Sequence, residues 1–139
     1  MHDRNGTMYP TLTVLIAEDN LIPALEIEDI IRDLGCQVVG PVGKLSEVIK
    51  LIETTPFDAA LLDVELKNSE KVYPAAELLR ARGIPFAFFT AYDREALGPR
   101  YAGAKVVQKP FLRSELESCV TDWMQGKKAA SDHPVRKGA

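Results

Sequence analysis

Five short apolar runs divide the chain, and polar residues, glycine or proline bound each of them. They occupy residues 11–17, 36–39, 57–62, 85–90 and 104–108. These runs are short and rich in Val, Ile, Leu and Phe, which favours β-strands buried on both faces over helices. Gly40 and Pro41 follow the second run and predict its end, because proline cannot donate to a sheet ladder.

Between these strands, apolar residues recur at three- and four-residue spacing. This period predicts amphipathic helices with one face turned toward the sheet. The expected inward-facing positions are Ala24, Ile27, Ile30, Ile31 and Leu34; Leu45, Val48, Ile49 and Ile52; Val72, Ala76 and Leu79; and Leu116, Cys119, Val120 and Trp123.

Capping and turn residues mark the ends of these helices. Asn20 predicts the N-cap of the first helix, and Gly35 predicts its end. Ser114 and Glu117 fit a capping box at the start of the last helix. Between the fourth and fifth strands, residues 93–97 have only a weak helical pattern, so we expect a short or pliable segment there.

The alternation of strand and helix predicts the fold class. Short apolar strands joined by amphipathic helices indicate an α/β protein, a doubly wound (βα)5 unit with a five-stranded parallel sheet covered on both faces. We expect one domain over residues 11–126, preceded by a flexible segment at 1–10 and followed by a flexible tail at 127–139.

Composition narrows the class of protein. The chain has 139 residues and a formal net charge of -3, which argues against a nucleic-acid-binding surface. No apolar run is long enough to span a membrane, and the first ten residues lack the apolar core of a signal peptide. Cys36 and Cys119 have no metal-ligand spacing and are interpreted as free buried thiols. We therefore expect a cytoplasmic protein that binds neither nucleic acid nor membrane.

Polar residues follow the predicted strands at their carboxyl ends. Glu18 and Asp19 follow the first strand, Asp63 the third, and Lys109 the fifth, while Thr90 ends the fourth. In open α/β sheets, ligands bind at this edge. Each residue taken alone has a plain structural role as a cap or loop residue, but together they predict one site.

These residue types suit phosphoryl chemistry. Clustered carboxylates repel one another unless a cation compensates, and Mg²⁺ prefers carboxylate, water and phosphate oxygens. A carboxylate can also attack phosphorus to form an acyl phosphate, whose transfer needs nearby positive charge. The chain contains neither of the common glycine-rich phosphate loops, which argues against a nucleotide site.

The set Glu18-Asp19, Asp63, Thr90 and Lys109-Pro110 resembles a response-regulator receiver domain, the CheY-like module of two-component signalling, over about residues 12–125. The resemblance implies a flavodoxin-like strand order of 2-1-3-4-5. It also implies that Asp63 accepts a phosphoryl group from a histidine kinase.

The resemblance further implies roles for the surrounding groups. Asp19, Asp63 and the backbone carbonyl of Glu65 would ligate Mg²⁺, with Mn²⁺ or Ca²⁺ as substitutes, and Glu18 would act through water. Lys109 would pair with the phosphoryl oxygens. Thr90 would bind the phosphoryl group and carry the signal.

Several departures from the common receiver pattern point to one subfamily. The loop after Asp63 contains neither the usual proline nor the usual glycine, and Val106 stands where many receivers have an aromatic residue. Residues 88–92 (FFTAY) instead resemble the FAT GUY type of stand-alone receiver, whose partner kinases are often of the HWE type. We interpret Tyr92 as the ring that reports the state of Thr90.

Two other functions fit some of these residues. A HAD-type phosphohydrolase also uses a strand-tip aspartate with Thr, Lys and Mg²⁺, but it needs a second aspartate where this chain has Glu65, and its nucleophile follows the first strand. A phosphate sink or relay without its own output is the other alternative. Too few residues follow the last helix to fold an output domain, so we expect a non-enzymatic switch that acts on a downstream protein or a phosphotransferase.

Overall fold

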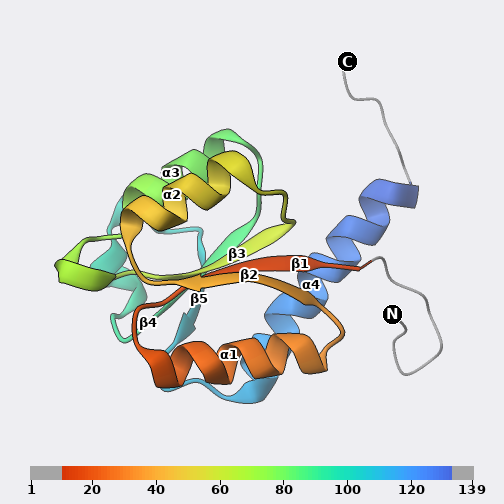
Figure 1. The fold of residues 1–139 in the computed structure, drawn as a ribbon, viewed down its shortest axis with the longest axis horizontal. Helices are drawn as coiled ribbons and strands as arrows, with labels where there is room; N and C mark the ends of the chain where they lie inside the picture. Colours follow the sequence, from red (N-terminus) through yellow and green to blue (C-terminus); the bar gives the residue numbers. More distant parts are fainter. Residues whose placement is uncertain (1–10, 133–139) are drawn as a thin grey trace.

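The sheet has five parallel strands in the order β2-β1-β3-β4-β5 (Figure 1). The computed structural model describes residues 11–132. Its strands are β1 (Thr13–Ala17), β2 (Gln37–Val42), β3 (Ala59–Asp63), β4 (Phe86–Thr90) and β5 (Lys105–Gln108). All neighbouring pairs run parallel. The predicted fold class and strand order are confirmed, and all five strands overlap the predicted apolar runs.

Helices cover both faces of this sheet (Figure 1). Side chains of α1 (Leu21–Asp33) and α4 (Arg113–Asp132) form one apolar cluster with the sheet, and side chains of α2 (Leu45–Thr54) and α3 (Tyr73–Ala81) form the other. The central strand β3 serves both clusters, since Leu61 belongs to the first and Leu62 to the second. Burial of both faces explains why the strand sequences are apolar throughout rather than alternating.

The predicted helical stripes face inward, but the caps differ from the prediction. Asn20 precedes α1, yet its side chain makes no cap hydrogen bond. Helix α4 begins at Arg113, before Ser114, and the Leu112 N–H donates to Glu115 Oε1 at 2.8 Å. The capping glutamate is thus Glu115 rather than Glu117, because the helix starts earlier than Ser114 suggests. Gly35 does end α1, with a φ of 86° that favours glycine.

Strand β2 continues through Gly40 and Pro41 instead of ending there. Its pairing with β1 shifts register between Leu15 and Ala17, and Ala17 then pairs with Val42. Among the strands of residues 11–132, β2 lies at the edge of the sheet and pairs with β1 alone, so the missing N–H of Pro41 breaks no hydrogen bond to a second strand.

The connection from β4 to β5 contains two 3₁₀ helices, η2 (Arg94–Leu97) and η3 (Pro99–Tyr101), and no α-helix. The expected short element is therefore confirmed. Leu97 and Tyr101 are nevertheless buried and fix this segment to the cluster beneath α2 and α3. A further 3₁₀ turn, η1 (Lys67–Ser69), follows β3.

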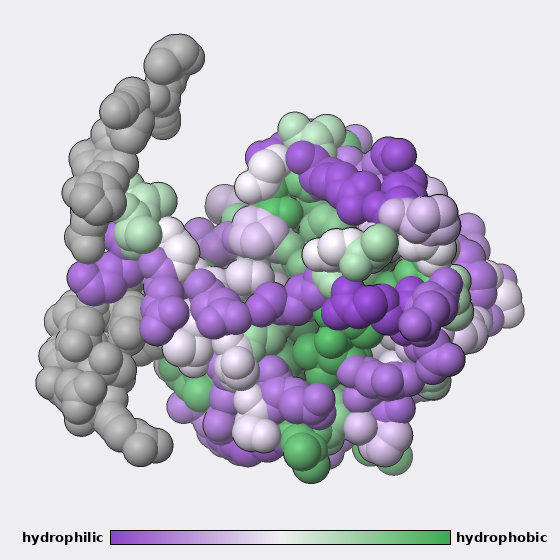
Figure 2. Space-filling view, turned by 180° about the vertical axis from the view of Figure 1, so that it is seen from behind, coloured by the Kyte–Doolittle hydropathy of each residue, from purple (hydrophilic) through white to green (hydrophobic). Residues whose placement is uncertain are grey.

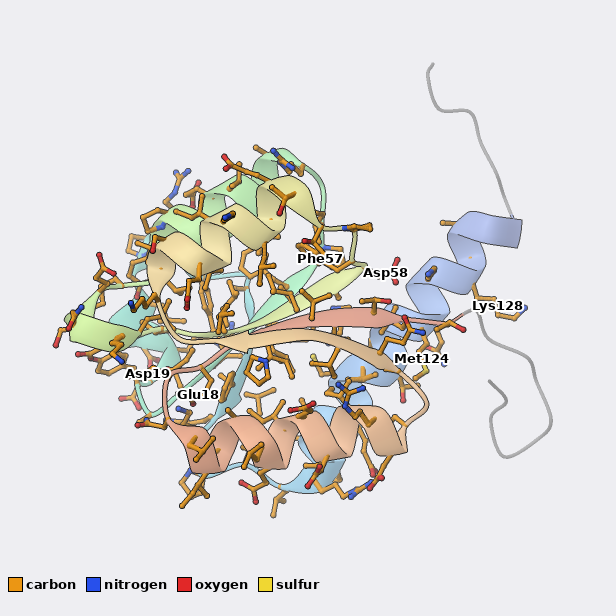
Figure 3. All side chains as sticks on the ribbon, viewed as in Figure 1. Glu18, Asp19, Phe57, Asp58, Met124 and Lys128 are labelled. Carbon is orange, nitrogen blue, oxygen red and sulfur yellow. The ribbon has the colours of Figure 1, made fainter. Side chains whose placement is uncertain are left out.

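Helix α4 extends to Asp132, past residue 126, where the sequence predicts the end of the domain. Lys127 on this extension donates to the Thr11 carbonyl at 2.6 Å and to Asp58 Oδ2 at 3.0 Å. Figure 3 shows Asp58 and Lys128 at the end of the molecule opposite Glu18. The remainder of the predicted tail and the N-terminal segment 1–10 lie outside the described residues.

Hydrophilic residues cover most of the surface seen in Figure 2, and apolar residues show between them. Cys36 and Cys119 are free and buried, as the sequence predicts. Within residues 11–132, no helix combines the length and apolar character that crossing a membrane requires.

Candidate functional site

The predicted site residues meet at the carboxyl edge of the sheet. Asp63 is the last residue of β3 and Thr90 the last of β4. The acidic pair follows β1, and Lys109 follows β5; Figure 3 shows Glu18 and Asp19 together at this edge. Because parallel strands end at a common edge, residues far apart in sequence are brought together here.

Lys109 joins the two buried carboxylates of the site. Its ammonium donates to Glu18 Oε1 at 2.8 Å and to Asp63 Oδ2 at 3.1 Å. The Glu18 side chain is 0% exposed and that of Asp63 is 9% exposed, so these ion pairs are shielded from bulk water. The ammonium also lies 4.7 Å from the centre of the Phe89 ring, a favourable cation–π distance.

The backbone on both sides of the site is held by hydrogen bonds. The Lys109 N–H donates to the Thr90 carbonyl at 2.7 Å, which continues the β4–β5 ladder beyond the strands. Glu18 Oε2 accepts from the Asn20 N–H at 2.9 Å, so one carboxylate serves both Lys109 and the start of α1. Glu18 therefore holds the start of α1 in place and also contributes negative charge to the site.

Burial and, after it, the negative charge of Glu18 raise the pKa of Asp63, while Lys109 lowers it, and the net result is a pKa of about 6. Burial alone would lower the pKa of Lys109. Its hydrogen bond to Glu18 and the charge of Asp63 outweigh burial, and the pKa is raised. At neutral pH the site thus holds an ionised carboxylate beside a protonated lysine.

Glu18, Asp19 and Asp63 form a donor set that fits a divalent cation. One carboxylate oxygen from each lies within 4.8 Å of the others. All three donors are hard oxygens, which suit Mg²⁺ or Ca²⁺ better than softer metals. Asp19 is exposed, so the cluster remains open to solvent on one side. The Glu65 backbone carbonyl stays a predicted ligand.

A hollow of about 480 Å³ lies over these carboxylates. Asp63, Thr90 and Lys109 line its floor, and Tyr92 and the loop after β3 line its rim. The hollow places a hydroxyl, a carboxylate and an ammonium around one space large enough for a phosphoryl group.

Tyr92 links Thr90 to the rim of the hollow. Its N–H donates to Thr90 Oγ1 at 3.1 Å, and its hydroxyl donates to Glu65 Oε1 at 2.5 Å. The residue is 38% exposed. The residue predicted to report on Thr90 is therefore bonded to it directly.

Sequence reasoning missed Lys71. Its ammonium donates to Glu65 Oε1 at 3.2 Å and to the Tyr92 hydroxyl at 3.1 Å. Lys71 thus joins Glu65 and Tyr92, two residues that line the hollow. An isolated bridge between Glu65 and Lys71 brings the ends of this loop together. Within the loop, Asn68 and Ser69 have φ of 63° and 59°, the left-handed conformation that the usual glycine would adopt easily.

An aromatic cluster packs around Phe88 of β4, and the sequence pattern does not reveal it. Tyr101 stacks on Tyr73 at 5.1 Å and meets Phe88 edge-on at 5.1 Å. Its hydroxyl bonds Glu77 on α3. Val106, at the position where many receivers have an aromatic residue, is paired with Phe88 in the sheet. The large ring beside β4 thus comes from η3 instead of β5.

No protein-family model matches the chain. A search of curated proteins finds the transcriptional regulatory protein PdtaR of Mycobacterium tuberculosis, 31% identical over 106 residues. The match covers 74% of this chain and 52% of PdtaR, so the chain spans about half the length of that relative.

Two solved structures are similar over nearly their whole length. SdrG from Sphingomonas melonis is 34% identical with a TM-score of 0.74, and the match covers 84% of this chain and 98% of SdrG. The receiver domain of the sensor histidine kinase PA1611 from Pseudomonas aeruginosa is 28% identical with a TM-score of 0.71, covering 84% and 99%; its structure holds a magnesium ion in the active-site cleft.

The strand order, the site at the carboxyl edge and these similarities agree with one another. The chain belongs to the response-regulator receiver domains of two-component signalling.

Proposed function

We propose that this receiver domain is a phosphorylation-dependent switch in which Asp63 accepts a phosphoryl group from a histidine kinase. The observation that carries the proposal is the pair of contacts from Lys109 to Glu18 and Asp63 beneath an open hollow. This arrangement holds an ionised carboxylate beside a cation while one side stays accessible to a phosphoryl donor.

The transfer uses groups whose positions support each step. An Asp63 oxygen attacks phosphorus, an acyl phosphate forms, and the phosphorus–nitrogen bond to the donor histidine breaks. Lys109 lies close enough to Asp63 to pair with the oxygens of the transferred group. Mg²⁺ bound by Asp19 and Asp63 would add positive charge next to these oxygens.

Thr90 and Tyr92 are the residues through which the phosphorylation signal is proposed to leave the site. The Thr90 hydroxyl now accepts the Tyr92 N–H, and it turns to the phosphoryl group once that group is present. Tyr92 then loses a partner on one side and keeps Glu65 and Lys71 on the other. A signal passes only because the phosphoryl group favours one arrangement over the other.

An apolar patch on α1 suits the helices of a kinase or a phosphotransferase. Leu21, Ile22 and Leu25 are 69%, 79% and 48% exposed on the first turns of α1, directly after the acidic pair. Leu112, in the loop after β5, is 68% exposed. Both segments follow strands at the carboxyl edge, so a partner bound there would lie next to Asp63.

Labelling with acetyl phosphate tests the acceptor role. In the presence of Mg²⁺ we expect one phosphoryl group per chain on the wild type and none on Asp63→Asn. Sustained turnover of a generic phosphomonoester, or labelling that persists in Asp63→Asn, would contradict a switch and favour an enzyme.

The partner surface can be tested separately. Ile22→Asp should slow phosphotransfer from a histidine kinase about tenfold or more, while labelling by acetyl phosphate stays at the wild-type rate, because the small donor does not need the patch. Equal loss with both donors would place the defect in the acceptor site and refute the docking surface.

Tyr92→Ala tests the switch. We expect normal labelling of Asp63 but a loss of the phosphorylation-induced change in the NMR spectrum of the β4–β5 connection. An unchanged response in a normally phosphorylated Tyr92→Ala protein would exclude Tyr92 as the reporter.

A further inference from the structure

The loop between β2 and α2 lies against the acidic pair at Gly43. A Cβ atom built on Gly43 would lie 2.7 Å from both the Cα and the Cβ of Asp19. Carbon atoms pack at about 3.5–4.0 Å, so no side chain fits there unless Asp19 moves. The backbone of Gly43 does not have a left-handed φ. Glycine is therefore required at this position because a side chain has no room, and not because of the backbone conformation.

The same loop connects the two segments that carry the acidic residues. The Glu18 N–H donates to the Val42 carbonyl at 2.9 Å, and the Lys67 N–H donates to the Gly43 carbonyl at 2.9 Å. The first bond holds the segment after β1. The second bond holds the η1 turn that follows Asp63 and Glu65.

The course of β2 places the loop there. The strand passes Gly40, where a Cβ would lie 2.9 Å from the Ile16 carbonyl oxygen, and it recovers pairing at Val42 opposite Ala17. Beyond this shift in register, Gly43 lies against Asp19. The residue that follows the edge strand therefore contacts the exposed member of the acidic cluster.

We propose that Gly43 is a positioning residue for the divalent-cation site, an inference that rests on the metal-binding part of the proposed function. Its missing side chain lets Asp19 approach Glu18 and Asp63, and its carbonyl fixes the turn after β3. Any side chain at position 43 displaces Asp19 and weakens cation binding without removing a ligand.

Mn²⁺ binding, measured from the EPR signal of free Mn²⁺, tests this role without any phosphoryl donor. We expect Gly43→Ala to weaken Mn²⁺ binding about tenfold, in the range found when groups that orient metal ligands are changed. Gly103→Ala is the matched control, because a Cβ there meets no atom within 4 Å. Its affinity should equal that of the wild type.

A double-mutant cycle shows whether Gly43 acts through Asp19. In an Asp19→Asn background, Gly43→Ala should cost much less affinity than it does in the wild type. Equal losses in both backgrounds, or wild-type affinity in Gly43→Ala, overturn the inference while the proposed function stands. Failure of the wild type to bind Mn²⁺ at all overturns the metal-binding part of the proposed function itself.

Amide hydrogen exchange on the wild type gives a test that needs no foldable variant. The Lys67 amide, bonded to the Gly43 carbonyl, should exchange more slowly when Mg²⁺ is added, because cation binding steadies both connected segments. The Thr55 amide, bonded to Leu51 at the end of α2, is the control and should not change. An unchanged Lys67 rate with Mg²⁺ bound contradicts the proposed connection.

Discussion

The Lys109 ammonium lies 3.1 Å from the Asp63 carboxylate, although 46 positions separate the two residues in sequence. The strand between them, β4, carries Phe89, whose ring centre lies 4.7 Å from the ammonium, and Thr90, whose carbonyl accepts the Lys109 N–H. The contact therefore depends on the sheet order and on the packing of the central strands. Removing either partner should affect both stability and chemistry.

Lys109→Met should destabilise the metal-free protein at neutral pH by about 2 kcal/mol, because Glu18 and Asp63 would remain buried without a cation. Urea unfolding measures the loss, and added Mg²⁺ should restore part of it by binding the folded state. Lys105→Met, which removes an exposed partner of Asp122, should cost about 0.5 kcal/mol or less. Similar losses of stability in the two variants would show that the buried ion pairs of Lys109 contribute no more than the exposed ion pair of Lys105.

The pKa of Asp63 predicts a pH dependence of stability in the absence of divalent cations. Because the folded-state pKa is raised from 3.8 to about 6, protonation favours the folded protein. The stabilising contribution is complete below about pH 3.8 and is lost as pH rises through about 6; the shift corresponds to about 3 kcal/mol. The unfolding free energy of the wild type, minus that of Asp63→Asn, should fall across this window. A constant difference between pH 4 and pH 7 would contradict it.

Tyr101→Ala should destabilise the protein by about 3 kcal/mol, because the ring is buried between Tyr73 and Phe88 and its loss leaves a cavity. Tyr101→Phe keeps the ring and removes only the hydroxyl that bonds Glu77, so its cost should be about 1 kcal/mol. Thermal or urea unfolding gives both values. Equal costs would mean that the hydroxyl, rather than ring packing, holds η3.

The two cysteines should be almost inert in the folded protein. Burial and the charge of Asp58 raise the pKa of Cys36 to about 11, and burial raises that of Cys119 to about 12. Thiolate is the reactive form, so labelling with Ellman's reagent at pH 8 should be about a hundredfold slower than in urea. Rapid labelling of the folded protein would show that one thiol reaches solvent.

The strands and the strand-tip residues could be predicted because both depend on simple local rules. A fully buried strand is apolar at every position, and parallel strands place their following residues at one edge. Asp63, Thr90 and Lys109 therefore stand out in the sequence without any structure. Their shared hollow follows from the topology alone.

The missed features depend on tertiary context. Pro41 indicates a strand end, yet it is tolerated in the edge strand β2. Gly126 indicates the end of a helix, yet α4 continues, and Lys127 is tied to Thr11 and Asp58. Tyr101 lies in a 3₁₀ segment with no α-helical period, so its burial leaves no periodic signal.

The bond between the Lys109 N–H and the Thr90 carbonyl fixes the backbone spacing of the two residues that carry the ammonium and the hydroxyl. The ammonium and the hydroxyl come from residues whose backbones are bonded to each other, and separating β4 from β5 there would break that bond. Under the proposed phosphorylation of Asp63, room for the new oxygens would therefore come from side-chain torsion angles. A partner that distinguished the two forms would then contact rotated side chains at the mouth of the site.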